Sequence, residues 1–505
     1  MRSLACDQIM QRLPQARSAS PGAPLNQLLY SCIRQTILEG GLAASTRLPP
    51  SRDLAAELRV SRNTVLYAYE QLLAEGYTRT LTGSGTFVCE RIPDRLLRSD
   101  SVAVERAGGT VPAPGRLSAR GKRVIEGSGA SPRQWGAFMP GLPDVTRFPH
   151  RQFRRSEARQ WRHLDPSMLS YADGDGHRPL HESLADYLRQ ARSVRCQPEQ
   201  ILVTEGVHQA VDLVARVLGD VGDLAWVEEP GYWGIRSVLT ANGIRLKPVP
   251  VDREGMTMPR QRPVPPRFAF VTPSHQYPLG SVMSMSRRLG LLEYAIRTGM
   301  WIIEDDYDSE FRFDGQPIPS LQGLLSGAPV IYIGTFSKTL YPGVRIAYMV
   351  LPGTLAGAFR TAQLELYRAG HLVTQAVLAE FIRDGAYAAH IRKMRLVYAA
   401  RRAFLVNLIH KWLGPEWLHE CDSETGLHLV LALPDDVDDE RLTQLALERG
   451  IIVRPLSGYY LSRARRPGLL LGFASLPEQQ MREPFEVLVR CIRECRASRR
   501  LAKAA

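Results

Sequence analysis

Six short apolar segments recur between residues 201 and 352, and longer amphipathic stretches separate them. They read ILVTEG, DLAWVEEP, FAFVTP, WIIEDDY, VIYIG and RIAYMVLP. Apolar runs of this length are typical of strands buried on both faces, because helices cover both sides of a parallel sheet. The alternation therefore predicts an α/β domain with a largely parallel sheet, which we place within residues 131–505.

A second, different pattern lies within residues 25–90 and predicts three helices. The first helix covers Leu25–Glu39, where apolar residues recur every four positions on one face. The next two helices are expected to begin with Ser51 and Ser61 as N-caps, because serine hydroxyls satisfy free backbone N–H groups at helix starts. The apolar face of the third helix is predicted to consist of Val65, Tyr69, Leu72 and Leu73.

A short turn between the second and third helices makes this segment a helix-turn-helix. Such a motif presents polar side chains at the start of its second helix to base edges in a DNA major groove. The segment YTRTLTGSGTFV then predicts a hairpin of two short strands around Gly83, Ser84 and Gly85, which would form a wing beside that helix. The outward polar residues of the third helix are Arg62, Asn63, Thr64 and Tyr67.

Charge favours nucleic acid as the partner of this N-terminal part. The net charge is +13, and residues 1–125 hold 17 Lys+Arg against 10 Asp+Glu, a surplus of 7. A basic excess that is concentrated on one domain is expected of a protein that contacts phosphates. Residues 1–24 are predicted to be an irregular lead-in, and residues 91–130, rich in Pro, Gly, Ser and Arg, a flexible linker.

Composition argues against several other classes. The seven cysteines include no C-x-x-C or C-x-C pair, so neither a zinc site nor a disulfide framework is indicated and no metal is expected. No segment approaches the ~20 consecutive apolar residues of a membrane span, and the start MRSLACDQIM lacks the apolar core of a secretory signal. We therefore expect a cytoplasmic protein without a membrane partner.

Residues 28–88 closely resemble the winged helix of GntR-type regulators, in LPPSRDLAAELRVSRNTVLYAYEQLLAEGY and GSGTFV. The resemblance implies that Arg52, Arg62, Asn63 and Thr64 face double-stranded DNA, and that the tip Gly83–Gly85 reaches the minor groove or the backbone. Ser51, Ser61 and Tyr67 are also expected at the DNA. Leu66 stands where many members of the family carry a longer polar residue, so this position is expected to add no base contact. A solvated helical bundle with incidental arginines is the alternative.

The surroundings of Lys338 suggest a covalent cofactor site. Lysine is scarce in this chain, and Lys338 directly follows a predicted buried strand in VIYIGTFSKTLYPGVRIAYMV. A Schiff-base lysine needs a partly desolvated amine beside an anion site. Thr335, Ser337 and Arg345 can supply that site with two hydroxyl groups and a guanidinium fork.

Two further segments strengthen this interpretation. WIIEDDYDSEFRF ends a predicted strand with the carboxylates Glu304, Asp305 and Asp306, and a carboxylate must pair with a pyridine nitrogen to keep it protonated. Each acid alone could equally be a solvated charge at a loop end or a metal ligand. In LVTEGVHQAVDLVARVL a strand turns at Gly206 into a helix, whose free N–H groups can bind a phosphate.

Residues 135–490 resemble a fold-type-I pyridoxal-phosphate enzyme of the aminotransferase kind, and fusion to a winged helix is characteristic of the MocR/GabR group of GntR regulators. The resemblance implies a smaller C-terminal α+β subdomain over roughly residues 395–505 and a head-to-tail homodimer. The matching segments are LPDVTRFPHRQFRR, LSYADGDGHRPLHESLADYLRQAR, EEPGYWGIRSVL, TPSHQYPLG, EDDYDSEFR, TFSKTLYPGVRIAYMVLP and LGFASLPE.

The resemblance also implies roles for individual residues toward pyridoxal 5'-phosphate. Lys338 would carry the cofactor as a Schiff base, Asp305 would pair with its ring nitrogen, and Tyr307 would bind its 3-oxygen. Tyr171 would reach the phosphate in the partner subunit. Tyr232 or Trp233 would cover the ring, and His275 or Tyr277 would line its other edge. The phosphate would be held by Thr335, Ser337, Arg345 and the turn of Gly206, Val207 and His208.

The chain departs from the family pattern at two places. The phosphate turn usually has serine where this chain has Val207, and glutamine where it has His208, which removes one hydroxyl donor. Tyr277-Pro278 replaces the Asn-Pro of ordinary aminotransferases, a change that is usual in the regulator group and suggests altered transamination.

An effector with a carboxylate needs an arginine, for which Arg454 is the first candidate and Arg236 the second; a surface salt bridge is an equal explanation for either. Three functions follow. The chain would regulate transcription on sensing an amine or amino acid that takes the place of Lys338 on the cofactor, or would sense the cofactor itself. Alternatively, it would be a working aminotransferase that its DNA-binding domain merely localises.

Overall fold

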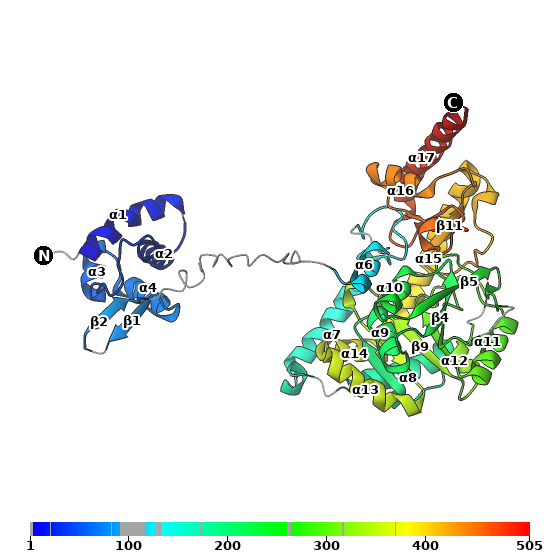
Figure 1. Ribbon diagram of the computed structural model, residues 1–505, viewed down its shortest axis with the longest axis horizontal. Helices are drawn as coiled ribbons and strands as arrows, with labels where there is room; N and C mark the ends of the chain where they lie inside the picture. The colour runs from blue at the N-terminus through cyan, green and yellow to red at the C-terminus, as the bar shows by residue number, and fades with distance from the viewer. Residues whose placement is uncertain are drawn as a thin grey trace, which may run out of the picture. The chain divides into compact units, whose positions relative to one another are not determined.

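The computed structural model divides the chain into two compact units, residues 1–115 and residues 116–505, which are described separately (Figure 1). Part of the predicted linker, residues 91–116, lies outside the described residues. The structure describes residues 4–20, 22–81, 83–90, 117–127, 129, 133–171, 174, 176–259, 264–315, 318–368 and 370–504.

The N-terminal unit has the predicted helix-turn-helix and hairpin. Apolar side chains from all four helices form one core, and the two strands pair antiparallel with Thr78 opposite Val88 and Leu81 opposite Gly85. A wing therefore follows the second helix of the motif, as predicted. The elements are α1 (Leu4–Ala19), α2 (Leu25–Leu38), α3 (Ser51–Leu58), α4 (Arg62–Ala74), β1 (Thr78–Leu81) and β2 (Gly85–Val88).

Helix α1 corrects the expectation of an irregular lead-in over residues 1–24. Cys6, Ile9 and Leu13 recur at helical spacing and are buried in the core of the unit, where α1 packs against α2. The signal was weak in the sequence because Pro14 lies inside the helix and polar residues fill the positions between the buried ones. The N-terminal unit is thus larger than its sequence pattern indicated.

The helix starts agree with the predictions in one of two cases. Ser61 is the N-cap of α4, and its hydroxyl accepts a hydrogen bond from the backbone N–H of Thr64 at 3.1 Å. Ser51 is instead the first residue of α3, after Pro50 at the cap position, and its hydroxyl accepts from Nε of Arg62 at 3.4 Å. The prediction for Leu73 was also wrong, since this side chain is 45% exposed.

An eight-stranded sheet forms the centre of the C-terminal unit, in the order β3-β10-β9-β8-β7-β4-β5-β6. Strands β5, β4, β7, β8 and β9 pair in parallel, whereas β10 runs antiparallel to both of its neighbours. The predicted parallel sheet is confirmed, because all six apolar segments become strands of it. The strands are β3 (Ile201–Thr204), β4 (Leu224–Glu229), β5 (Arg245–Asp252), β6 (Gly255–Met256), β7 (Phe268–Val271), β8 (Trp301–Asp306), β9 (Val330–Thr335) and β10 (Ala347–Val350).

Helices cover both faces of this sheet, as the continuous apolar runs predicted. The adjacent residues Ile302 and Ile303 of β8 belong to different apolar clusters, the first shared with α11 and the second with α9, α10 and α13. The helices are α6 (Ala119–Glu126), α7 (His150–Arg162), α8 (Arg178–Arg192), α9 (Val207–Leu218), α10 (Trp233–Ala241), α11 (Met285–Thr298), α12 (Leu321–Leu324), α13 (Gly353–Tyr367), α14 (Leu372–Arg383), α15 (Ala386–Trp412), α16 (Asp439–Glu448) and α17 (Glu478–Ala504). Short 3₁₀ helices are η1 (Val145–Arg147), η2 (Pro166–Leu169), η3 (Pro198–Gln200), η4 (Pro342–Val344), η5 (Pro415–Trp417) and η6 (Leu456–Tyr459).

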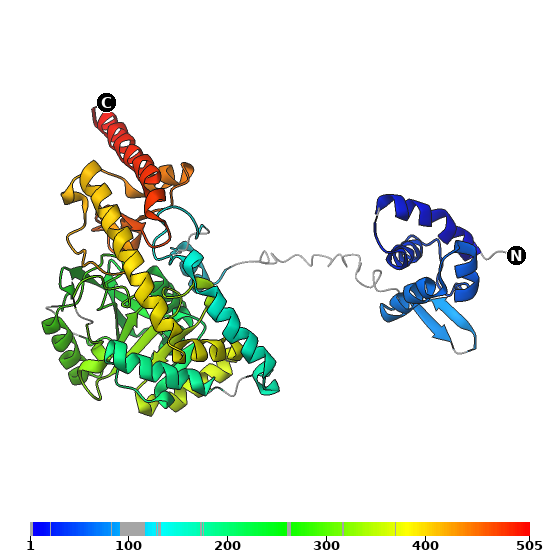
Figure 2. The ribbon, with the colours of Figure 1, turned by 180° about the vertical axis from the view of Figure 1, so that it is seen from behind.

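A smaller α+β subdomain completes the unit, as expected from the resemblance. Its antiparallel sheet has the order β11-β13-β12, with β11 (His428–Ala432), β12 (Arg454–Pro455) and β13 (Gly468–Gly472). Helices α15, α16 and α17 pack together beside it. Figure 2 shows the long helix α15, in yellow to orange, running from the large sheet region to this subdomain.

Helix α6 corrects the predicted linker over residues 91–130. Ser118 caps this helix by accepting from the N–H of Gly121 at 3.0 Å, and the helix packs against α10. The apolar side chains of α6 are too few to reveal a buried face in the sequence, since no residue of the helix is fully buried. Among the described residues, no helix combines the length and the apolar character needed to cross a membrane.

Candidate cofactor pocket and DNA-binding surface

A pocket of about 210 Å³ opens where β8, β9 and the start of α9 meet. Parallel strands end at one edge of the sheet, so residues that directly follow different strands are brought together there. The predicted site residues that line the pocket are Val207, His208, Tyr232, Tyr277, Asp305, Tyr307, Thr335, Ser337, Lys338 and Arg345.

Lys338 follows β9 and its amine lies inside this pocket. Nζ donates a hydrogen bond to the carbonyl oxygen of Gly141 at 2.9 Å. Burial lowers the pKa of the Lys338 amine, although the nearby carboxylates of Asp308 and Asp305 act in the opposite direction. A lowered pKa makes the neutral, nucleophilic form of an amine more abundant at neutral pH.

Asp305 is a buried carboxylate that lines the same pocket as Lys338. Its Oδ1 is buried and has no hydrogen-bond partner. Burial, together with the neighbouring Asp306 and Glu228, raises the pKa of Asp305 to about 7. A buried carboxylate oxygen without a donor is costly, and a cationic N–H donor placed in the pocket would relieve that cost.

The two neighbouring acids have other partners. Glu304 accepts from the backbone N–H groups of Leu321 at 2.9 Å and Gln322 at 3.1 Å. Asp306 pairs with Nε of Arg192 at 2.7 Å and accepts from the hydroxyl of Tyr332 at 2.6 Å. Of the three carboxylates, only Asp305 lines the pocket, and none is the solvated charge that each acid alone could have been.

A candidate anion-binding corner lies at the start of α9. Gly206 precedes this helix with φ +96°, and Arg345 donates from NH2 to the carbonyl oxygen of Glu205 at 2.8 Å. Ser337 donates its backbone N–H to Oγ1 of Thr335 at 3.2 Å. Free N–H groups at a helix start, a guanidinium and two hydroxyls form a group of donors suited to a phosphate.

Aromatic rings also line the pocket. The hydroxyl of Tyr232 lies 3.1 Å from Nε2 of His208, and its ring is perpendicular to that of Tyr277 at 5.7 Å between centroids. His275 does not line the pocket. It lies behind Tyr307, with Nδ1 2.9 Å from the Tyr307 hydroxyl and 2.9 Å from Oδ1 of Asp308.

Sequence reasoning missed several residues here. Asp308 holds the His275 ring that contacts Tyr307, and its position three residues after Asp305 in the same acidic segment was the available signal. Gly141 has no such signal, because only the fold brings it to Lys338. Among the described residues, no three His, Cys, Asp or Glu side chains are grouped so that they could hold a metal ion.

Tyr171 lies outside this pocket of its own chain. Its side chain is 78% exposed, and the guanidinium carbon of Arg368 lies 5.6 Å from the centre of its ring. Its expected contact with a partner subunit's cofactor stays a prediction.

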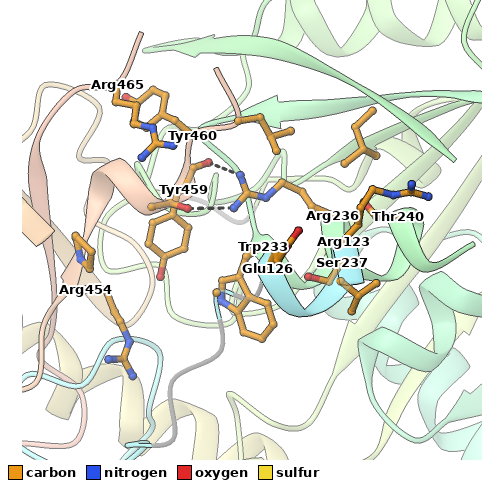
Figure 3. A pocket seen from close by; sticks show the side chains of 17 residues that line it. Arg123, Glu126, Trp233, Arg236, Ser237, Thr240, Arg454, Tyr459, Tyr460 and Arg465 are labelled. Atoms are coloured by element: carbon orange, nitrogen blue, oxygen red, sulfur yellow. Dashed lines mark hydrogen bonds between the residues drawn. The ribbon is translucent and has the colours of Figure 1, made fainter. Parts of the chain in front are cut away.

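A second pocket, of about 450 Å³, contains both arginines considered for an effector carboxylate (Figure 3). Arg236 is buried and donates to the carbonyl oxygens of Tyr459 at 3.0 Å and Gly458 at 3.1 Å, so its guanidinium already has acceptors. Arg454 is half-buried and donates to the carbonyl oxygen of Arg133 at 2.8 Å.

The walls of this second pocket come from different parts of the unit. Figure 3 shows Arg454 and Arg465 of the small subdomain on one side and Arg123 of α6 on the other. The hydroxyl of Tyr459, which lines this pocket, lies 3.1 Å from the hydroxyl of Tyr277, which lines the first. The two pockets therefore share a wall made by these tyrosines.

The predicted DNA-binding residues lie on the surface of the N-terminal unit. Arg52, Arg62, Asn63 and Tyr67 are exposed, and Ser51 and Thr64 are half-buried. Gly83 and Ser84 are exposed at the tip of the wing, and a Cβ at Gly85 would lie 3.0 Å from Nε of Arg47. Sequence reasoning missed Arg47, which pairs with Phe87 of β2 in an isolated bridge and adds a cation to the wing.

Comparison with known proteins gives two family matches. Residues 25–88 match the bacterial regulatory proteins of the gntR family, and residues 146–488 match the class I and II aminotransferases. The probable rhizopine catabolism regulatory protein MocR of Rhizobium meliloti is 41% identical over 92% of this chain and 93% of its own length. The pyridoxine biosynthesis transcriptional regulator PdxR of Corynebacterium glutamicum is 32% identical over 93% of this chain and 96% of its own.

Solved structures resemble the C-terminal unit. The α-aminoadipate aminotransferase LysN of Thermus thermophilus, complexed with N-(5'-phosphopyridoxyl)-L-leucine, covers 75% of this chain and 96% of its own at 26% identity and a TM-score of 0.66. The multiple substrate aminotransferase of Thermococcus profundus covers 75% and 97% at 24% identity and a TM-score of 0.67.

Proposed function

This chain belongs to the MocR-type transcription regulators, which join a GntR helix-turn-helix domain to an aminotransferase domain, and we propose that it senses an amine or amino acid at Lys338. The observation that carries the proposal is the unpartnered Oδ1 of Asp305 in the pocket that contains the Lys338 amine. Class I and II aminotransferases use pyridoxal 5'-phosphate, whose protonated ring nitrogen is the donor that such an oxygen needs.

The residues of the pocket fit that cofactor. Lys338 would bind it covalently through its amine, and Asp305 would hold the proton on the ring nitrogen. The hydroxyl of Tyr307, oriented by His275, would donate to the ring oxygen. The anion-binding corner of Thr335, Ser337, Arg345 and the start of α9 would hold the phosphate. When bound, the cofactor supplies an electrophilic carbon that reacts with primary amines.

The effector would extend from the first pocket into the second. Four guanidinium groups line the second pocket, against a single carboxylate, Glu126; they are those of Arg123, Arg236, Arg454 and Arg465. This charge favours an effector with an acidic group. Arg454 is our first candidate for its carboxylate, and Arg236 is the second, because Arg236 already donates to two carbonyl oxygens.

Coupling to DNA would use α6. This helix provides one wall of the second pocket and is the first described element after the DNA-binding unit. An effector that contacts Arg123 would change the stability of α6 on α10. Such an effector can shift DNA binding only if it binds the arrangement of the protein that binds DNA and the arrangement that does not with different affinities.

We further propose a head-to-tail homodimer that binds double-stranded operator DNA in the cytoplasm. The exposed Tyr171 would complete the partner's phosphate site. Residues Arg52, Arg62, Asn63, Thr64 and the wing around Ser84 would contact the two half-sites, and phosphate contacts would make the binding salt-dependent.

A working aminotransferase is the second candidate, because Lys338 and Asp305 would serve turnover equally well. Sensing of the cofactor itself is the third. Sensing of an amine and sensing of the cofactor are separated by DNase footprinting of the intergenic DNA next to the gene of this chain. The footprint is compared without cofactor, with cofactor, and with cofactor plus candidate amines. Multiple turnover with an amino donor and a 2-oxo acid, without any effect of amines on the footprint, would support the enzyme instead.

A further inference from the structure

A third pocket, of about 190 Å³, lies between α8, α15 and the loop that follows β8. None of its lining residues lines the cofactor pocket. The side chains that decide its chemistry are Arg192, Ser309, Glu310, Arg312, Arg392 and Arg395.

Four buried polar atoms on the loop part of this pocket have no hydrogen-bond partner. They are Nε and NH1 of Arg312, Oγ of Ser309 and Oε2 of Glu310. Leaving a buried donor or acceptor unpaired costs about 1–3 kcal/mol, and folded proteins rarely leave several together. Three of the four atoms carry a donor hydrogen, so the missing partner is one that accepts hydrogen bonds.

The charge around these atoms is positive. Arg192 is neutralised by Asp306, and Glu310 accepts from the hydroxyl of Tyr187 at 3.1 Å. Arg395 donates from Nε and NH2 to the main-chain oxygen of Glu310, at 3.0 and 2.8 Å, and so keeps its charge uncompensated. With Arg312 and the exposed Arg392, three guanidinium groups stand against one carboxylate.

We propose that this third pocket binds a small oxyanion, a phosphate or a carboxylate group. Arg312 offers two N–H donors without a partner, Nε and NH1, and its guanidinium is a charged donor of the kind that oxyanions accept from. Ser309 adds a hydroxyl donor, and Arg392 and Arg395 add charge from α15. Burial raises the pKa of Glu310 to about 7, so its repulsion of an anion weakens as the pH falls toward 6.

The loop that forms this pocket also connects the cofactor pocket to the small subdomain. It continues directly from β8 and Tyr307, and the N–H of Gly426 donates to the carbonyl oxygen of Phe311 at 2.8 Å. Phe313 donates its N–H to the carbonyl oxygen of Glu424 at 3.1 Å. A bound oxyanion would therefore hold in place a loop that contacts both parts of the unit.

Isothermal titration of the full chain with inorganic phosphate, at constant ionic strength and saturating pyridoxal phosphate, tests the proposal. We expect Arg392→Gln and Arg312→Gln to weaken phosphate binding about tenfold or more, since each removes a charge-assisted contact. Lys393→Gln is the matched control, because Lys393 neighbours Arg392 on α15, is exposed and does not line the pocket. Glu310→Gln should tighten binding, since it removes the one repelling carboxylate and retains an acceptor for Tyr187.

The outcomes are distinct. Loss of phosphate binding in the arginine variants but not in Lys393→Gln supports a phosphate ligand, and the same pattern with acetate alone supports a carboxylate. Equal binding by all variants overturns the proposal, as does absence of binding of either anion, which would leave water as the partner of the four atoms. Arg392 is exposed, so Arg392→Gln should fold and can test oxyanion binding even if Arg312→Gln does not fold.

Discussion

Gly206 and Arg345 approach so closely that a Cβ on Gly206 would lie 2.7 Å from NH2 of the guanidinium. Gly206 also has φ +96°, a conformation that other residues rarely adopt. The phosphate site proposed at the start of α9 and Arg345 therefore requires a residue without a side chain at this position. Any substitution of Gly206 therefore causes both a steric clash with Arg345 and backbone strain.

Gly206→Ala is expected to weaken binding of pyridoxal phosphate about tenfold or more, because the methyl group displaces Arg345 from the anion-binding corner. Absorbance titration of the cofactor measures this. Gly222→Ala is the matched control: its φ is +97°, but a Cβ there meets no atom within 4 Å. If both variants lose affinity equally, the cause is backbone strain and not the contact with Arg345.

Asp305→Asn is expected to stabilise the cofactor-free C-terminal unit at high pH. Burial raises the pKa of Asp305 to about 7, so the folded state retains a proton that the unfolded state has lost. This group therefore favours folding at low pH, and its contribution is lost as the pH rises from about 4 to about 7. The difference in free energy of unfolding between the variant and the natural chain should therefore grow by on the order of 2–4 kcal/mol, in favour of the variant, from pH 4 to pH 8.

Urea unfolding followed by tryptophan fluorescence measures this gain, because all seven tryptophans lie in the C-terminal unit. Asp435→Asn, which makes the same substitution at an exposed position of the same unit, is the matched control. A stability difference for Asp305→Asn that stays constant from pH 4 to pH 8 would argue against a buried carboxylate with a raised pKa.

Arg62→Ala is expected to weaken operator binding by about 1–3 kcal/mol if Arg62 makes a bidentate base contact. Fluorescence anisotropy at matched salt gives the affinity, and its salt dependence separates a base contact from a phosphate contact. Arg12→Ala on α1 is the control, since Arg12 pairs with Glu39 and lies outside the helix-turn-helix. Unchanged affinity in Arg62→Ala would remove this residue from the interface.

Ile9→Ala is expected to destabilise the N-terminal unit by about 2–5 kcal/mol, because Ile9 is fully buried in its core. Circular dichroism should show this loss while the tryptophan-detected transition of the C-terminal unit stays in place. The exposed Gln11→Ala should have little effect. Equal stability of the two variants would mean that α1 does not belong to the core.

The sequence was most informative where local pattern and chemistry coincide. Asp305 lies at the end of β8, Tyr307 follows this strand and Lys338 follows β9, so the apolar runs placed all three at strand ends. Their separate roles toward a cofactor came from the family resemblance. Helices α1 and α6 were missed, because the few apolar residues of each become recognisable only when a neighbouring helix covers them.

The third pocket had no sequence signal at all. Ser309, Glu310 and Arg312 form an ordinary polar segment, and only their burial against α8 and α15 shows that donor atoms lack acceptors. His275 illustrates the same limit, since a histidine predicted beside the cofactor instead supports Tyr307 from behind. Distances between side chains from distant segments depend on packing that a pattern does not encode.

Covalent binding of pyridoxal phosphate by Lys338 is tested most directly by reduction with borohydride in the presence of the cofactor, followed by mass spectrometry of peptides. We expect a phosphopyridoxyl group on the peptide that contains Lys338. Lys338→Ala should abolish labelling but retain operator binding, whereas Lys393→Ala should change neither. Labelling spread over several lysines, or none at Lys338 in a folded chain that binds DNA, would contradict it.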